Sequence, residues 1–179
     1  VTHPTKVSAI GGKFMFDDDQ ETPNTLTATW EFDVAGKKRM MNFEVRHWIS
    51  NHEASIGGDK PGNTIGNMFY GSNGYLVVDG NKYTTYLGKD HQPGPTANQP
   101  ETHYANFVEA VRSRKPEMLN CDVEEGALSC NLVHLANISY RLGRTLHWDA
   151  KTLTCVGDPE ANKMLTREYR APFVVPANV

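Results

Sequence analysis

The chain has 179 residues, a formal net charge of −3 and a pI near 6.2. A chain of this length can bury most of its unfolded surface in one core, so we expect a single domain over residues 1–179. The slightly acidic charge, with no basic stripe interleaved with aromatic residues, excludes a nucleic-acid partner. No apolar run approaches the roughly 18 residues of a membrane span, so no membrane partner is expected.

The three cysteines, Cys121, Cys130 and Cys155, are odd in number and form no CxxC motif. This spacing indicates neither a disulfide framework nor a thiolate zinc site, and predicts buried, reduced thiols. Such cysteine usage favours a soluble, cytoplasmic protein. The chain begins with Val1 rather than methionine, which leaves open whether it is a fragment or a complete gene product.

Residues 25–32, TLTATWEF, alternate apolar and polar positions with a period of two, the pattern of a half-buried strand. After the turn-like AGKK at 35–38, the run RMMNFEVRHW at 39–48 repeats the alternation. We therefore expect these two strands to pair as a hairpin.

Three further short strands, NMFY, YLVVD and KYTTYL, are separated by GSNG and GN, which are turn residues. They predict an antiparallel meander. An opening strand, KVSAIGGKFMF, has Gly11 and Gly12 in its middle, which indicates a bulge or a close backbone approach. In total we expect about six strands in a strand-rich region, residues 1–90.

A proline- and glycine-containing loop at 88–100 precedes a helix-rich region, residues 100–143. Apolar residues at helical spacing predict a helix over 101–114. A leucine-rich stripe predicts a longer helix over 123–142, which ends at Gly143. Residues 144–179 are expected to form an extended C-terminal strap with a short helix near 159–165.

Because the strands precede the long helices, the expected fold class is α+β, an open and mostly antiparallel sheet with two long helices packed on one face. We expect the sheet face that carries no helices to be buried as well. Trp30 or Trp48, Met40 and the segment 83–86 could form an apolar outer face that is buried against a second subunit or another domain.

Five segments, in order, resemble a known family: EVRHW, GNMFYGSNGYLVVDG, HYANFVEAVRSRK, LNCDVEEGALSCNLVHLANISYRLGRTLHWD and GDPEANKMLTREYRAPFVVP. Together they are similar to the C-terminal domain of the Gfo/Idh/MocA oxidoreductases, the glucose-fructose oxidoreductase and inositol dehydrogenase family, and specifically to the bacterial subgroup with long C-terminal domains. The resemblance implies an open antiparallel sheet, helices on one side and a homodimer interface on the free sheet face.

The resemblance also implies catalytic parts that this sequence lacks. Family members bind NAD(P) on an N-terminal Rossmann domain with a GxGxxG turn, and no such motif occurs here. They also carry a Glu-Lys-Pro segment and a helix with a catalytic histidine, which would lie upstream of Val1. Asp59-Lys60-Pro61 resembles the lysine segment only superficially, because it lies in a glycine-rich loop. The chain alone is therefore expected to bind no NAD(P).

Four carboxylates lie close together in the segment FDDDQETP: Asp17, Asp18, Asp19 and Glu21. Such a segment could offer oxygen ligands to a calcium ion, although it lacks the D-x-D-x-D-G spacing of a calcium loop. The alternative is a solvated turn. We retain both interpretations, a calcium site and a solvated loop.

Three residues are candidates for binding a substrate: Arg46, Trp48 and His103. Arg46 and Trp48 alternate along one strand, where a guanidinium would lie beside a stacking surface for a sugar ring. His103 begins a predicted helix, whose N-terminal donors could meet a sugar hydroxyl or a carboxylate. The alternatives are an outward salt bridge and interface packing.

These observations leave three functions open. The first is the substrate-side and oligomerisation domain of a nicotinamide-dependent sugar oxidoreductase, acting on a sugar-like molecule. The second is a stand-alone hydrolase of lactones or esters that uses calcium. The third is a carbohydrate-binding or structural module without turnover.

Overall fold

The computed structural model describes residues 2–49, 66–98 and 102–176, which belong to two compact units. Unit 1 comprises Val1–Trp48 and Val123–Val179, and unit 2 comprises Ile49–Asp122. The α+β class is confirmed, and the described strands form two antiparallel sheets, one in each unit. The domain expected over residues 1–179 therefore contains two separately compact parts.

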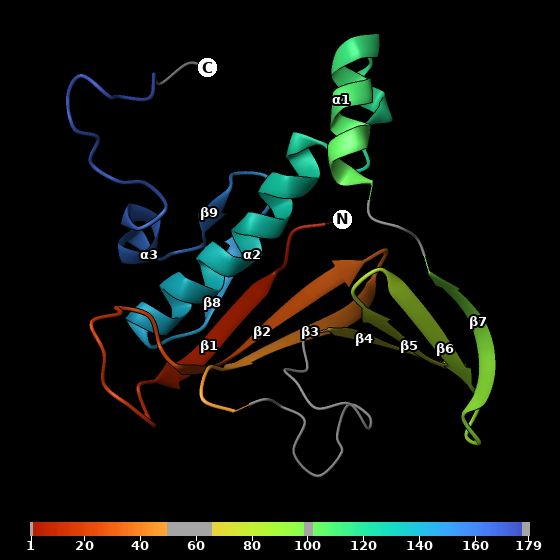
Figure 1. Cartoon of the computed structure of the whole chain (residues 1–179). Coiled ribbons are helices and arrows are strands. Elements are labelled where there is room, and N and C mark those ends of the chain that lie inside the picture. Colours follow the sequence, from red (N-terminus) through yellow and green to blue (C-terminus); the bar gives the residue numbers. More distant parts are fainter. Residues whose placement is uncertain (1, 50–65, 99–101, 177–179) are drawn as a thin grey trace. The chain divides into compact units, whose positions relative to one another are not determined.

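Unit 1 contains a five-stranded sheet and two helices (Figure 1). The sheet order is β3-β2-β1-β8-β9. Every pairing in this sheet is antiparallel. The elements are β1 (Lys6–Gly12), β2 (Thr25–Val34), β3 (Lys37–Arg46), α2 (Val123–Leu142), β8 (Leu146–Asp149), β9 (Thr154–Cys155) and α3 (Pro159–Lys163).

The hairpin predicted from the alternating residues is confirmed. Strands β2 and β3 pair without interruption from Thr25↔Arg46 to Val34↔Lys37. Ala35 and Gly36 form the turn with φ angles of 52° and 74°. Two consecutive positive φ angles are typical of the two-residue turn whose twist matches the flanking strands.

The glycine pair in β1 marks a close backbone approach rather than a bulge. The register between β1 and β2 continues unbroken through Gly11↔Leu26. A Cβ atom on Gly11 would lie 2.5 Å from the Thr25 carbonyl oxygen. Any larger residue at position 11 would therefore push β1 and β2 apart.

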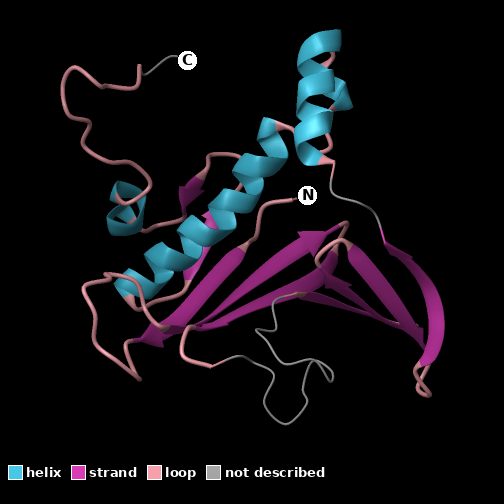
Figure 2. Cartoon of the chain, viewed as in Figure 1, coloured by secondary structure: helices cyan, strands magenta, loops and turns pink. Residues whose placement is uncertain are grey.

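Helix α2 lies across one face of the unit 1 sheet and forms the core with it (Figure 2). Leu135 and Ile138 of the predicted leucine-rich stripe are 1% and 3% exposed. Trp30 is also in this core: it is 3% exposed, and its Nε1 donates to the Leu132 carbonyl at 3.1 Å. The prediction that Trp30 could belong to an outer face is therefore wrong, because the α2 helix covers the sheet face that carries it.

Ser139 connects α2 to the sheet by a pair of hydrogen bonds. Its side chain is fully buried in the core. The hydroxyl accepts from the Ala9 backbone N–H at 3.0 Å and donates to the Arg144 carbonyl at 2.7 Å. One buried hydroxyl therefore satisfies both a β1 amide and a carbonyl just beyond the helix.

The chain leaves α2 through Gly143 and then forms an ion-pair cluster. Gly143 has a φ of 64°, and the Arg144 N–H donates to the Ser139 carbonyl at 3.3 Å, as in a helix that ends at a left-handed residue. The Arg144 guanidinium donates to both Asp158 oxygens at 2.9 Å and to Glu160 at 2.7 Å. We call Arg144, Asp158 and Glu160 the Arg144 clasp, because it ties the end of α2 to the start of α3.

The Arg144 clasp should make stability depend on pH. The hydrogen bonds from Arg144 lower the pKa of Asp158 from 3.8 to about 2. Since the folded-state pKa lies below the unfolded one, the stabilisation is complete above about pH 4 and is lost as the pH falls towards 2. Asp158→Asn removes the charge but retains an acceptor for the Ala161 N–H, which Asp158 caps. Urea unfolding should show wild type more stable than the variant at pH 7.

This difference should shrink as the pH approaches 2. The control is Glu109→Gln, a carboxylate substitution outside the clasp. A wild-type advantage over Asp158→Asn that stayed constant from neutral to acid pH would contradict the assignment of this stabilisation to the Asp158 charge.

Unit 2 contains a four-stranded antiparallel meander in the order β4-β5-β6-β7. The turn residues predict its first three strands, but the loop predicted over 88–100 is wrong in part, because residues 92–98 pair with β6 as a fourth strand at the sheet edge. Its elements are β4 (Asn67–Gly71), β5 (Gly74–Asp79), β6 (Lys82–Leu87), β7 (Gln92–Asn98), α1 (His103–Ser113) and a short 3-10 helix, Pro116–Met118. Helix α1 is confirmed, but its apolar stripe, with Tyr104 85% and Phe107 61% exposed, lies at the surface of the described structure.

Two remaining sequence expectations concern membranes and cysteines. Among the described helices, none combines the length and apolar character needed to cross a membrane. All three cysteines are free, as expected. Cys155 is buried, whereas the predicted burial is wrong for Cys121 and Cys130, which are exposed.

Candidate functional site

The loop between β1 and β2 folds against the end of β3 through one buried side chain, Asn24, which is 3% exposed. Its amide oxygen accepts from the Phe14 N–H at 3.1 Å, and its amide nitrogen donates to the Phe16 carbonyl at 2.9 Å. The Asn24 carbonyl also accepts from the His47 N–H at 3.0 Å. Asn24 therefore holds the acidic segment and the end of β3 at the same edge of the unit 1 sheet.

Trp48 and Arg46 meet beside Thr25, the first residue of β2. The Trp48 Nε1 donates to the Thr25 hydroxyl at 2.8 Å, and Arg46 is the register partner of Thr25. Trp48 remains 38% exposed. The hydrogen bond therefore fixes the indole in place while part of it stays open to solvent, which suits a stacking surface.

Arg46 pairs with Glu44, but its shielded Nε makes no hydrogen bond within the described part of the chain. The Arg46 Nε lies 3.3 Å from Glu44 Oε1, and the second guanidinium nitrogen donates weakly to Glu44 Oε2 at 3.5 Å. The Nε is shielded from solvent yet has no hydrogen bond with a described residue, because the short ion-pair distance lacks the required alignment. A shielded, unsatisfied donor is costly, and a bound oxygen would satisfy it.

The acidic segment is arranged mainly in ion pairs. Lys13 Nζ lies 2.9 Å from Asp18 Oδ1, and this contact is the main cause that lowers the pKa of Asp18. Glu21, at the other end of the segment, pairs with Arg141 at 3.4 Å. Asp18 and Glu21 therefore each use a carboxylate oxygen on a cationic side chain of this chain.

This arrangement does not fit a calcium ion, which takes about six to eight oxygen ligands. Asp17 and Asp19 are exposed. Within residues 2–49, 66–98 and 102–176, no three carboxylate, histidine or cysteine side chains converge as a metal site requires. The calcium site at Asp17, Asp18, Asp19 and Glu21 stays a prediction, and the observed contacts favour the solvated loop.

The third candidate substrate residue, His103, belongs to unit 2. It is exposed at the first position of α1, and the preceding Thr102 provides no side-chain cap. Arg46 lies in unit 1, so the candidates belong to different units. The segment Asp59-Lys60-Pro61 lies outside the described residues.

The sequence did not predict how two residues organise this site: Asn24 as the buried anchor of the loop, and Lys13 as the partner of Asp18. Asn24 follows Pro23 directly before a strand, and asparagine at such a turn commonly bonds to nearby backbone groups. That signal marks a turn but does not reveal the burial of Asn24. The partner of Asp18 is five residues away along an irregular loop, which no periodic pattern encodes.

Comparison with known proteins identifies the class of this chain. Residues 79–175 match the family model described as "Oxidoreductase family, C-terminal alpha/beta domain" of the Gfo/Idh/MocA proteins. The match covers more than half of the chain. The chain therefore belongs to this family, and the predicted resemblance is confirmed. No curated protein matches the chain.

Solved structures agree with the fold. One is a protein of Thermotoga maritima assigned as an oxidoreductase, with a TM-score of 0.58 and 13% identity over 79% of this chain and 40% of that chain. Another is the Bacillus subtilis protein YvaA, also assigned as an oxidoreductase, with a TM-score of 0.51 and 17% identity over 82% of this chain and 46% of that chain. This chain thus spans less than half the length of each.

The nicotinamide cofactor that the family implies does not fit the residues described here. Dinucleotide sites use a parallel strand followed by a helix whose N-terminus meets the pyrophosphate. Every described strand pairing in this chain is antiparallel. No step of hydride transfer can therefore be assigned to these residues.

Proposed function

We propose that this chain is the substrate-side and oligomerisation domain of a nicotinamide-dependent sugar oxidoreductase. The carrying observation is the Trp48 indole, fixed by Thr25, near an Arg46 Nε that pairs with Glu44 but makes no hydrogen bond with a described residue. Membership of the family supports the oxidoreductase context. In this role the chain binds and orients a sugar, while the nicotinamide is held by residues other than those described.

An aromatic ring and a guanidinium recognise a sugar in complementary ways. The apolar face of a pyranose packs on an indole, and its hydroxyl oxygens accept from a guanidinium. On the mostly polar sheet face opposite α2, Ile10 is 77% exposed, and this apolar side chain supports the oligomerisation role. An exposed apolar surface on a sheet commonly marks an interface.

Tryptophan fluorescence tests this function directly, because Trp48 is the exposed tryptophan. The other two, Trp30 and Trp148, are 3% and 8% exposed. Titrating the chain with glucose should give a saturable change in emission that Trp48→Phe abolishes. Arg46→Met should weaken the apparent affinity roughly tenfold, the loss of one charge-assisted hydrogen bond.

Arg112→Met on helix α1 is the matched control and should leave the glucose titration unchanged. Titration with NAD⁺ or NADP⁺ should give no saturable change, and a micromolar affinity for either would overturn the proposal. If the fluorescence response to glucose persisted in Trp48→Phe, it would contradict the proposal that the sugar binds at Trp48. Sedimentation velocity that shows a monomer at every concentration would remove the oligomerisation role.

A further inference from the structure

A second polar site lies on the face of the unit 1 sheet opposite α2. Val7 and Trp30 point into the core, so their neighbours Lys6, Ser8 and Glu31 lie on the other face. There they surround a cavity of about 320 Å³. The cavity is lined by Lys6, Val7, Ser8, Thr29, Glu31, Lys38, Arg39, Met40 and Thr145.

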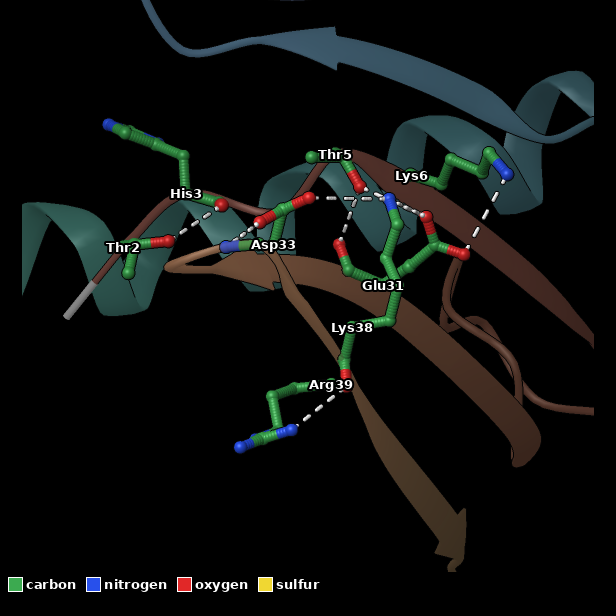
Figure 3. A network of polar contacts seen from close by, with 9 residues as sticks. Thr2, His3, Thr5, Lys6, Glu31, Asp33, Lys38 and Arg39 are labelled. Atoms are coloured by element: carbon green, nitrogen blue, oxygen red, sulfur yellow. Dashed lines mark hydrogen bonds and ion pairs between the residues drawn. The ribbon is translucent and has the colours of Figure 1, made fainter.

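Glu31 holds two lysine ammonium groups at this cavity (Figure 3). Lys38 Nζ donates to Glu31 Oε1 at 3.0 Å, and Lys6 Nζ lies 3.7 Å from Glu31 Oε2. The hydrogen bond between Lys38 and Glu31 lowers the pKa of Glu31 and raises that of Lys38. Both groups therefore stay charged near neutral pH, and the lysine heads are positioned before any ligand arrives.

The two ammonium groups face two carboxylates, Glu31 and Asp33, so what they offer a ligand is unused donor hydrogens. Lys38 Nζ also lies 3.8 Å from Asp33 Oδ2. Lys6 forms its ion pair, within the described residues, with Glu31 at 3.7 Å. Each ammonium carries three donors, so both retain hydrogens for a ligand. Figure 3 shows the Arg39 guanidinium directed away from Glu31, and we assign it no part in the site.

Hydroxyl donors complete the lining. The Ser8 and Thr145 hydroxyls make no hydrogen bond with another residue in the described part of the chain, and both border the cavity. Thr29 donates to the Asn42 side chain at 2.9 Å and is already satisfied. Ammonium groups beside free hydroxyls form the donor set that an oxyanion requires, and Met40 adds an apolar border.

We propose that this cavity binds a small oxyanion, a phosphate or carboxylate group, held between the Lys6 and Lys38 ammonium groups and the Ser8 and Thr145 hydroxyls. The cavity volume lies at the lower end of the range of ligand sites, about 300–1,000 Å³, and leaves room for a small organic body attached to the anion. The site is separate from the Arg46–Trp48 arrangement.

Nuclear magnetic resonance of the ¹⁵N-labelled 179-residue chain tests the proposal with inorganic phosphate as the probe. The amide signals of Ser8, Thr29 and Thr145 should shift in a saturable manner, at an ionic strength kept constant with sodium chloride. Lys6→Gln should weaken phosphate binding about tenfold because it removes one charge-assisted hydrogen bond. Lys38→Gln should weaken it to a similar extent.

Lys37→Gln is the matched control, since Lys37 is exposed on the same strand and does not line the cavity. It should change phosphate affinity less than twofold. Equal weakening by Lys37→Gln and Lys6→Gln would mean unspecific attraction and would overturn the proposal, as would the absence of saturable shifts at tens of millimolar phosphate. Circular dichroism establishes that each variant is folded.

Two further probes identify the source of the anion. Tighter binding of glycerol 3-phosphate than of inorganic phosphate would show that the ligand is an organic oxyanion, and equal binding would point to the free ion. Uncharged glycerol should leave the three amide signals in place. If glycerol shifted them as strongly as glycerol 3-phosphate, the site would recognise hydroxyls rather than an anion, and the proposal would fail.

Discussion

Replacing Leu135 with alanine should lower the free energy of unfolding by about 3 kcal/mol, within the range of about 2–5 kcal/mol for large-to-small core substitutions. Leu135 is among the largest fully buried side chains, at 1% exposure, and it packs in the core that α2 forms with the unit 1 sheet. Alanine removes the packed side-chain atoms and leaves a cavity that the surrounding side chains can fill only in part.

Urea unfolding followed by circular dichroism measures this loss. Val133→Ala is the control, because Val133 lies two residues away on the same helix and is 66% exposed. Its effect should stay below about 1 kcal/mol. Equal losses for the two variants would show that helix formation, and not burial of Leu135, determines stability.

The second large effect is expected at Ser139. Ser139→Ala removes the hydroxyl that connects the Ala9 amide and the Arg144 carbonyl, and leaves both groups without that partner in the core. A buried polar group without a partner costs about 1–3 kcal/mol, so a loss of about 2–4 kcal/mol is expected for the pair. The same urea experiment measures it.

Ser129→Ala provides a matched control. The Ser129 hydroxyl donates only to the Glu125 carbonyl one turn earlier, at 2.8 Å, on the exposed side of α2. Its removal should change stability by no more than about 0.5 kcal/mol. If Ser139→Ala were equally mild, water would have replaced the hydroxyl, and the connection between β1 and α2 would carry little energy.

Local patterns were sufficient to predict the hairpin and the long helix. The alternation in β2 and β3 and the turn at Ala35 and Gly36 lie within one short stretch of chain. The stripe of α2 likewise depends on spacing over a few turns. Elements of this kind are encoded by neighbours in sequence, and the structure confirms them.

Features that depend on distant parts of the chain were not predictable in the same way. Alternation shows that Trp30 shares a face with Ala28, but the cover of that face is a helix about 100 residues later, as the Trp30–Leu132 hydrogen bond shows. The unit 1 sheet is completed by the pairing of β1 with β8. No local signal in either strand specifies that partner.

The candidate site was predicted in part. Arg46 and Trp48 were predicted to alternate along one strand, but β3 ends at Arg46 and Trp48 lies in the turn after it, where its indole donates to Thr25, the register partner of Arg46. The ion pair of Asp18 with Lys13 was missed, because an irregular loop has no repeat from which contacts can be inferred. The cavity beside Glu31 was missed as well, since its lining comes from β1, β2, β3 and the segment after α2.

The Ser139–Ala9 hydrogen bond joins residues 130 positions apart, and β1 also pairs with β8 at the far end of the chain. During synthesis on the ribosome, β1, β2 and β3 emerge long before the helix that covers them. Contacts between such distant residues slow folding, and the hairpin exposes its apolar face during the delay. The nascent chain therefore keeps this apolar face uncovered until α2 and β8 have left the exit tunnel.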